Sequence, residues 1–229
     1  QYDFCITDKS DEFPEEFDGK ILVPFAVESK LSGVCKTVNP EDVLWYRRYF
    51  TLDESFTGKR VMLNFGGVDY SSAVYVNRKL VGTHKGGYTP FSFDITDYLE
   101  PYKNELIVEV TDPSETGWQD RGKQVRKSTG FWYTATSGIW QTVWLEPVNE
   151  IHIKKIKLTP DIDDSTVRLE SDFDGEATVR AIVKDGDEII FAGTVSRDER
   201  IKIKDEKLWS PESPFLYDIA IALCGENGE

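Results

Sequence analysis

Residues 59–77 read KRVMLNFGGVDYSSAVYVN, and the stretch contains two alternating patterns separated by a pair of glycines. In Lys59–Phe65 every second residue is apolar, which is typical of a strand that buries one face. Ser72–Asn77 keeps the same period of two. Between them, Gly66 and Gly67 allow backbone geometry that a side chain would block. The stretch therefore predicts two strands of one β-structure.

The same period continues along the chain on the C-terminal side of this stretch. Further strands are predicted at Phe91–Ile95, Glu105–Val110 and Ile139–Leu145. Turn residues separate the strands at Asn77-Arg78-Lys79, Lys85-Gly86-Gly87 and Tyr102-Lys103-Asn104. Because no segment has a sustained apolar stripe at helical spacing, we expect only short helices. The pattern predicts an all-β protein built as antiparallel sandwiches.

The composition changes after Pro147-Val148-Asn149, where we place a domain boundary. Beyond it Trp209 is the only remaining tryptophan, charged residues become more frequent and the predicted strands shorten. These strands are Ile153–Leu158, Thr166–Ser171, Ala177–Val183, Glu188–Val195, Arg200–Ile203 and Tyr217–Leu223. They number about six, one fewer than an immunoglobulin-type sandwich commonly has. We therefore predict domains at 1–148 and 149–229, the second lacking its last strand.

Charge and hydropathy exclude several classes of partner. The 229 residues include 41 acidic and 27 basic side chains, which gives a formal net charge of −14. Since no Lys/Arg cluster is present to neutralise phosphates, we expect neither nucleic acid nor an anionic membrane as a partner. No apolar run approaches the roughly 18 residues of a membrane span.

The cysteines give no sign of a metal site. Cys5, Cys35 and Cys224 are odd in number and widely spaced, without the short Cys/His spacings that bind zinc. We interpret them as reduced thiols, which favours a cytoplasmic over a periplasmic or secreted location. We predict no metal and no cofactor.

Five stretches together resemble one enzyme family. They are Leu44–Phe50 (LWYRRYF), Phe65–Asn77 (FGGVDYSSAVYVN), Gly82–Thr96 (GTHKGGYTPFSFDIT), Ser137–Glu146 (SGIWQTVWLE) and Trp209–Tyr217 (WSPESPFLY). The first four are similar to the sugar-binding domain of family 2 glycoside hydrolases, the group of β-galactosidases, β-glucuronidases and β-mannosidases. The last looks like part of the immunoglobulin-like domain that follows it. The resemblance covers nearly the whole chain, in order.

The resemblance implies a fold and a role. The fold would be a jelly-roll, galactose-binding-like sandwich followed by an incomplete immunoglobulin-like sandwich. Family 2 enzymes are retaining glycosidases, which need two carboxylates about 5 Å apart. In the family both lie on a C-terminal (β/α)8 barrel, which this chain lacks. We therefore assign no catalytic residue here and expect the chain alone to be inactive.

A long polar connection, Asp112–Tyr133, is the candidate substrate-binding segment. In the family, a loop of the sugar-binding domain reaches the mouth of the barrel's active site. Connections longer than about 15 residues without structure of their own are often functional. Aromatic faces and polar donors suited to sugars are supplied by Trp118, Arg121, Lys123, Gln124, Trp132 and Tyr133.

One position departs from the family pattern. Counting back from Ser137-Gly138-Ile139, β-galactosidases and β-glucuronidases carry a glycone-binding Asp where this chain has Trp132. The replacement argues against both specificities. A subgroup with another glycone, or a pocket rebuilt by Gly122-Lys123-Gln124, stays open.

Three functions remain as alternatives. The first is an accessory region of a glycosidase, with a carbohydrate substrate, its own C-terminal barrel and a homo-oligomer as expected partners. The second is a free-standing carbohydrate-binding module, and the third is an adhesive protein of two sandwiches. The fold alone does not separate them, because sandwiches host many functions.

Overall fold

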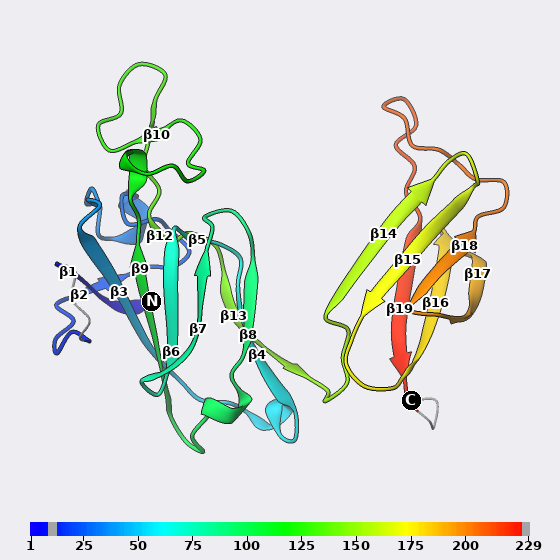
Figure 1. The fold of residues 1–229 in the computed structure, drawn as a ribbon, viewed down its shortest axis with the longest axis horizontal. Coiled ribbons are helices and arrows are strands. Elements are labelled where there is room, and N and C mark those ends of the chain that lie inside the picture. Colours follow the sequence, from blue (N-terminus) through cyan, green and yellow to red (C-terminus); the bar gives the residue numbers. More distant parts are fainter. Residues whose placement is uncertain (9–12, 226–229) are drawn as a thin grey trace. The chain divides into compact units, whose positions relative to one another are not determined.

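The computed structural model describes residues 1–8 and 13–225, and it is built from strands with a few single turns of 3-10 helix (Figure 1). The chain divides into two compact units, Gln1–Val148 and Asn149–Glu229, called unit 1 and unit 2 below. Within the described residues, no helix has the length and hydropathy needed to cross a membrane. The prediction of an all-β fold of antiparallel sheets is confirmed.

The strands are separated by connections of very different length, the longer ones lying at residues 22–41, after residue 111 and at residues 203–217. The strands of unit 1 are β1 (Tyr2–Asp8), β2 (Gly19–Ile21), β3 (Asp42–Phe50), β4 (Arg60–Phe65), β5 (Val68–Asp69), β6 (Ser71–Val76), β7 (Lys79–Lys85), β8 (Phe91–Asp94), β9 (Asn104–Thr111), β10 (Gln124–Val125), β11 (Tyr133–Thr134), β12 (Gly138–Ile139) and β13 (Val143–Val148). The strands of unit 2 are β14 (Lys155–Asp161), β15 (Thr166–Asp172), β16 (Thr178–Asp185), β17 (Glu188–Val195), β18 (Asp198–Lys202) and β19 (Asp218–Cys224). The 3-10 helices are η1 (Lys30–Ser32), η2 (Glu54–Phe56), η3 (Thr96–Tyr98) and η4 (Ser114–Thr116).

Unit 1 is a sandwich of a six-stranded and a three-stranded antiparallel sheet. The strand orders are β2-β1-β3-β9-β6-β7 and β13-β4-β8. Val61, Leu63 and Phe65 alternate along β4 and are at most 2% exposed. They pack in one core with side chains of the larger sheet, among them Tyr46 and Val108. The alternation in the sequence therefore identified the buried face of this strand.

The predicted strand Ile139–Leu145 is wrong as a single element. Ile139 ends β12, which pairs with β5, and a new strand begins at Val143 and pairs with β4. Between them, the amides of Trp140 and Gln141 both donate to the carbonyl of Gly67, at 3.4 and 3.3 Å. The chain turns because these two amides bond to a distant loop rather than to a ladder partner.

Unit 2 is a smaller sandwich of two three-stranded antiparallel sheets. Their orders are β14-β15-β18 and β17-β16-β19. Val179, Ala181 and Val183 alternate along β16 and are buried. They pack with Leu169 of the other sheet. The β16–β17 hairpin turns at Gly186, whose φ of 58° is left-handed, a conformation that glycine adopts readily.

Candidate functional site

The predicted substrate-binding connection, Asp112–Tyr133, leaves the end of β9 and projects beyond the sandwich of unit 1 (Figure 1). Its base is fixed by Asp112, which is 4% exposed. One carboxylate oxygen of Asp112 accepts from Ser137 Oγ at 2.6 Å, and the other accepts from the amide of Ser114 at 2.7 Å. The hydrogen bond between Asp112 and Ser137 therefore joins the start of the loop to the residues that follow its end, at the edge of the core.

The loop has structure that the sequence pattern does not predict. Gln124–Val125 and Tyr133–Thr134 form a short parallel pair, and the helix η4 forms its first turn. Arg126 Nε donates to Glu115 Oε1 at 3.0 Å, and the amide of Arg126 donates to Glu115 Oε2 at 3.2 Å. These contacts join the outgoing half of the loop to the returning half.

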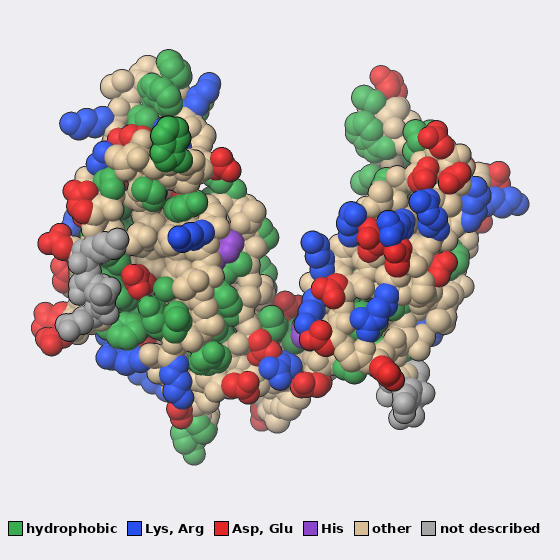
Figure 2. All heavy atoms as spheres, viewed as in Figure 1, with side chains coloured by type: hydrophobic (Ala, Val, Ile, Leu, Met, Phe, Trp, Pro, Cys, Tyr) green, Lys and Arg blue, Asp and Glu red, His purple; other side chains and the backbone are tan. Residues whose placement is uncertain are grey.

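Aromatic side chains of the loop face solvent. Trp118 is 101% exposed, and Phe131, Trp132 and Tyr133 are exposed as well. The rings of Phe131 and Trp132 stack with their centroids 4.9 Å apart. Lys123 Nζ lies 5.7 Å from the centroid of the Phe131 ring. Figure 2 shows hydrophobic and basic side chains together on this projection.

The other two predicted contact residues take part in holding the loop. Gln124 is half-buried; its Nε2 donates to Tyr88 Oη at 3.2 Å, and its Oε1 accepts from the amide of Thr136 at 2.9 Å. Arg121 Nη1 donates to the carbonyl of Gly117 at 3.3 Å. The structure thus brings Lys123 and Trp132 to the Phe131 ring, and the amide of Tyr133 donates to the carbonyl of Lys123 at 2.9 Å. Gln124 instead holds the loop to Tyr88 and Thr136.

Three carboxyl groups lie beneath the loop, in the wall of unit 1. Asp69 ends β5 and is 3% exposed, and it lies close enough to Asp112 and Glu28 for both to act on its charge. A Cβ at Gly87 would come within 2.7 Å of the Asp69 carboxyl carbon. Glycine at position 87 therefore makes room for this carboxyl group.

The environment of these carboxyl groups disfavours their charge. Burial, together with the nearby charges of Asp112 and Glu28, raises the pKa of Asp69 to about 7. Burial also raises the pKa of Asp112, although hydrogen bonds from Ser137 and Ser114 oppose the shift. The pKa of Glu28 is raised by burial too, and its carboxylate accepts from the amide of Ser137 at 3.0 Å. Both carboxylate oxygens of Asp112 and one of Glu28 thus accept structural hydrogen bonds.

A metal is not indicated by this cluster. In residues 1–8 and 13–225, no group of three or more His, Cys, Asp or Glu side chains is arranged to hold a metal ion. Sequence reasoning missed Asp69, Glu28 and Asp112, which are far apart in the chain. The nearest signal was Gly86-Gly87, which we interpreted only as a turn although Gly87 also admits the carboxyl of Asp69.

Two family models match the chain, one after the other. Residues 19–147 match the sugar-binding domain of glycosyl hydrolases family 2, and residues 151–229 match a second model of the same family. The first match alone covers more than half of the chain. The chain belongs to glycosyl hydrolase family 2. The resemblance seen in the sequence motifs is therefore confirmed, including the order of its two parts.

Relatives in family 2 are much longer than this chain. It is 30% identical to a β-galactosidase of Thermoanaerobacter pseudethanolicus over 96% of its own length and 32% of that protein. It is also 30% identical to a β-galactosidase of Clostridium acetobutylicum, over 85% of this chain and 22% of that protein. The chain therefore spans less than a third of the length of either relative.

Solved structures support the same fold. A β-glucuronidase of Faecalibacterium prausnitzii superposes with a TM-score of 0.76 at 23% identity, over 97% of this chain and 43% of that one. A Ruminococcus gnavus β-glucuronidase in complex with D-glucuronic acid gives a TM-score of 0.67 at 22% identity, over 81% of this chain and 34% of that one. The β-sandwich fold is thus shared with these two β-glucuronidases.

Proposed function

We propose that this chain is the non-catalytic N-terminal region of a retaining β-glycoside hydrolase. In the longer protein, the loop at Asp112–Tyr133 would form part of the active-site mouth, and both sandwiches would support a C-terminal catalytic barrel. One observation carries the proposal: two family 2 models match in order along a chain that spans 32% of a β-galactosidase relative.

The loop has the chemistry that a wall of a sugar pocket needs. Exposed aromatic rings can lie against the C–H faces of a sugar, and this is the role we assign to Trp118, Trp132 and Tyr133. Lys123 presents a charged donor beside them. Gln124 and Arg121 keep the loop in shape through their contacts with Tyr88 and Gly117.

The carboxyl groups of the chain do not suit catalysis. A retaining mechanism needs one carboxylate free to attack and a second carboxyl free to protonate the leaving group. Asp112 and Glu28 are held by Ser137 and Ser114, which leaves neither free for these roles. Asp69 is 3% exposed, and its burial keeps the carboxyl group out of reach of a substrate.

The glycone is a separate question. The relatives named above are β-galactosidases and β-glucuronidases. The family resemblance implies a glycone-binding Asp in both groups at the position where this chain has Trp132. We propose that the parent enzyme prefers a different β-glycoside, or that it holds the glycone through residues other than position 132.

The test is hydrolysis of a panel of nitrophenyl β-glycosides by this chain and by the longer protein. We expect activity in the longer protein alone, and its preferred glycone identifies the specificity. Activity in this chain would overturn the proposal. If neither hydrolyses any glycoside while this chain binds glycans with a Kd below about 1 mM, the function is that of a binding module.

Variants of the longer protein test the role of the loop. We expect Trp118→Ala and Trp132→Ala to raise KM several-fold, because each removes an aromatic face. Tyr102→Ala is the matched control, since Tyr102 is 87% exposed in the turn before β9, at the end opposite the loop. An equal effect of all three variants would show that the loop has no special role.

A further inference from the structure

The carboxyl group of Asp69 is buried in unit 1 without a group that stabilises its charge. Asp69 is 3% exposed, and its backbone pairs with Gly138 of β12. Among the described residues, neither a hydrogen-bond donor nor a cation is paired with its carboxyl group, and the charges that act on it, those of Asp112 and Glu28, are negative. Ionisation of Asp69 in this place therefore costs free energy, because a buried charge is stable only when it is paired.

The two neighbouring carboxyl groups cannot move away to relieve this cost. Asp112 is held by hydrogen bonds from Ser137 Oγ and from the amide of Ser114. One oxygen of Glu28 accepts from the amide of Ser137, and its other oxygen is buried without a hydrogen bond among the described residues. Three carboxyl groups from three separate segments thus share one buried region, and like charges at close range disfavour a further ionisation.

The turn between β7 and β8 packs directly against Asp69. A Cβ at Gly87 would lie 2.7–2.8 Å from the carboxyl atoms of Asp69, so the backbone of the turn is already in contact with this group. Two hydrogen bonds hold the turn in place: the amide of Gly86 donates to the carbonyl of Tyr70 at 3.1 Å, and Trp140 Nε1 donates to the carbonyl of Gly87 at 2.8 Å. Water can therefore hydrate an ionised Asp69 only if the turn moves.

The same turn carries a contact that braces the candidate substrate-binding loop. Tyr88 follows Gly87, and its Oη accepts from Gln124 Nε2 at 3.2 Å. This is one of two side-chain contacts that hold Gln124 to residues outside the loop, and the other is with the amide of Thr136. Burial and the charges of nearby carboxyl groups, among which Asp69 has the largest effect, raise the pKa of Tyr88. A movement of the turn away from Asp69 would therefore carry Tyr88 away from Gln124.

We propose that Asp69 is a pH-sensitive switch that controls the position of the loop at Asp112–Tyr133. When Asp69 is protonated, the turn closes over it and Tyr88 braces Gln124. When Asp69 is ionised, the turn opens to admit water and the loop loses this brace. The inference rests on the proposed function only in calling the loop a wall of a sugar pocket, since the switch itself lies within this chain.

Other titratable groups face the turn from the elements packed around it. Asp112 and Glu28 lie on the side of the core, and Asp120 of the loop acts on Tyr88. His84 lies on the turn itself, with its Nε2 3.2 Å from the carbonyl of Gly86. Since this imidazole already has a backbone partner and does not act on Asp69, we assign the switch to the carboxyl group.

The direction of the pH dependence follows from the pKa of Asp69, which burial and the charges of Asp112 and Glu28 raise to about 7. In the open turn, water returns this pKa toward its ordinary value near 3.9. The closed turn thus holds the proton more tightly, so closure is fully favoured below about pH 4 and weakens as the pH rises to 7. Between pH 6 and pH 8 the open population should rise roughly tenfold and level off above pH 7.

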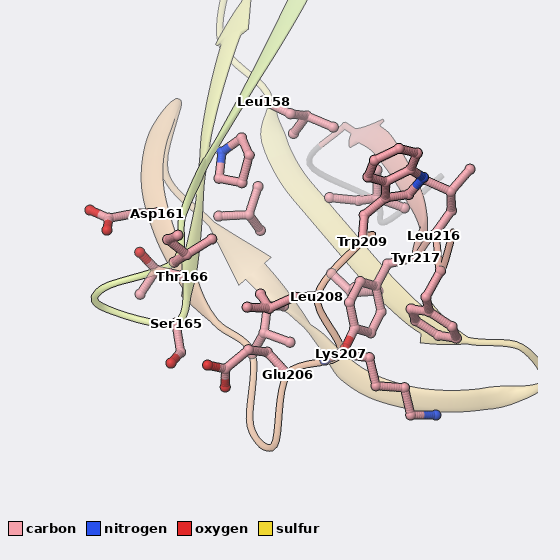
Figure 3. Close-up of a pocket in the computed structure, with 17 residues that line it drawn as sticks. Leu158, Asp161, Ser165, Thr166, Glu206, Lys207, Leu208, Trp209, Leu216 and Tyr217 are labelled. Carbon is pink, nitrogen blue, oxygen red and sulfur yellow. The ribbon is translucent and has the colours of Figure 1, made fainter. Parts of the chain in front are cut away.

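Limited chymotrypsin digestion of this chain between pH 6 and pH 8 measures the open population. Cleavage within residues 118–133 follows that population when opening is faster than cleavage. Trp209, which is 59% exposed in an apolar groove of unit 2, is the internal control for the pH dependence of the protease (Figure 3). The pKa values of Asp161 and Glu206, which also line this groove, are lowered by hydrogen bonds, so both stay charged throughout the range.

We expect loop cleavage, relative to cleavage at Trp209, to rise roughly tenfold from pH 6 to pH 8 while the sandwich of unit 1 stays intact. A ratio that does not change with pH would overturn the inference. Cleavage spread over the whole of unit 1 at pH 8 would overturn it as well, because it would show global unfolding instead of movement of the loop. This measurement needs no substitution.

Three variants assign the effect to Asp69. Asp69→Asn should cleave slowly at every pH, because the buried group stays neutral. Tyr88→Phe lacks the hydroxyl group that accepts from Gln124, and it should cleave at pH 6 about as fast as wild type does at pH 8. His84→Gln is the matched control on the same turn and should keep the wild-type profile. If His84→Gln removes the pH dependence and Asp69→Asn retains it, the inference is wrong.

The outcomes separate this inference from the proposed function. A longer protein that hydrolyses glycosides, with loop cleavage in this chain independent of pH, retains the function and loses the switch. If loop cleavage depends on pH and on Asp69 but the longer protein hydrolyses no glycoside, the switch stands and the proposed function fails.

Discussion

The two sandwiches of this chain differ in how completely they enclose their cores. In unit 1, Phe65 and Tyr46 are wholly buried between layers that the unit itself supplies. In unit 2, Leu169 is just as buried, but its cross-strand neighbour Leu158 remains 40% exposed. Since burial of apolar surface is the main stabilising term, about 25 cal/mol per Å², unit 1 should be the more stable unit. Similar alternation in the sequence thus produces a closed core in one unit and an open one in the other.

The two units also differ in what they bury. Among the described residues, the buried polar groups of unit 1 include Asp69, Asp112 and Asn104, whereas unit 2 buries only Ser171. Buried carboxyl groups cost stability unless hydrogen bonds or protonation compensate. Unit 1 can accommodate them because its core is large, and they lie directly beneath the loop that we assign to carbohydrate contact. The polar chemistry of the chain is therefore concentrated in the unit with the closed core.

The largest expected effect comes from Gly138, which helps to close unit 1. Its φ is +87°, and a Cβ there would lie 1.9 Å from Tyr46 Oη. Gly138→Ala should lower the free energy of unfolding of unit 1 by about 3 kcal/mol or more, from backbone strain and overpacking. Chemical denaturation followed by tryptophan fluorescence measures this, and the transition of unit 2 should not move.

Gly122→Ala is the matched control for this substitution. Gly122 also has a positive φ, +62°, but nothing lies within 4 Å of an added Cβ. Gly122→Ala should lower the free energy of unfolding of unit 1 by about 1 kcal/mol, because of the backbone conformation alone. Equal losses for the two variants would show that contact with Tyr46 contributes nothing to the closure of unit 1.

The next effect compares the covered and uncovered faces of unit 2 directly. Leu169→Ala should cost about 2–4 kcal/mol, because it leaves a cavity in a packed core. Leu158→Ala should cost about 1 kcal/mol or less in this chain, since much of the side chain is already in water. Thermal unfolding of unit 2 measures both. Similar losses of stability for the two variants would mean that Leu158 is covered in solution, and unit 2 would then enclose its core as completely as unit 1 does.

The strands could be predicted from the sequence because their signal is local. Val179, Ala181 and Val183 alternate within one strand, and no other part of the chain is needed to recognise the pattern. The break between Ile139 and Val143 could not be predicted in this way. It depends on hydrogen bonds from Trp140 and Gln141 to Gly67, a residue that only the fold brings near.

The residues of the candidate site also fall into two groups, those that the sequence alone identifies and those whose role depends on contacts made in the fold. Trp118, Trp132 and their neighbours stand out by residue type in a long connection, so sequence alone nominated them. The bracing role of Gln124 depends on Tyr88, which reaches it from another loop. The shifted pKa of Asp69 depends on Asp112 and Glu28, which no spacing rule connects to it. Contacts between distant segments are what the sequence does not reveal.

A third prediction uses the difference in buried charge. Because the pKa of Asp69 is raised from 3.8 to about 7, the folded protein holds this proton more tightly than the unfolded chain. The contribution of Asp69 to stability is therefore fully present below about pH 4 and is lost as the pH rises toward 7. Asp69→Asn should stabilise unit 1 by about 2 kcal/mol at pH 8 and have little effect at pH 4.

Unit 2 provides the control for this pH dependence. Its described residues bury no carboxyl group, so its own transition should differ little between wild type and Asp69→Asn at either pH. The measurement is thermal unfolding at pH 4, 6 and 8. A variant that is destabilised equally at all three values would show that the Asp69 carboxyl makes a necessary structural contact instead.

The smallest expected effect concerns the loop at Asp112–Tyr133, which belongs to the stable unit but lies outside its core. The Glu115–Arg126 pair is partly exposed, and such pairs contribute about 1 kcal/mol or less to global stability. Arg126→Gln should therefore leave the unfolding of unit 1 nearly unchanged. It should nevertheless speed chymotrypsin cleavage at the exposed aromatic residues of the loop, because the two halves lose their link.

Lys127→Gln removes the same charge from the exposed neighbouring position and serves as the control. If cleavage accelerates only for Arg126→Gln, the loop is held by its own internal contacts and opens without the sandwich. Equal cleavage of both variants would mean that Asp112 and Ser137 at the base hold the loop unaided. A large loss of unit 1 stability in Arg126→Gln would contradict the prediction. It would mean that the loop at Asp112–Tyr133 and the sandwich of unit 1 unfold together.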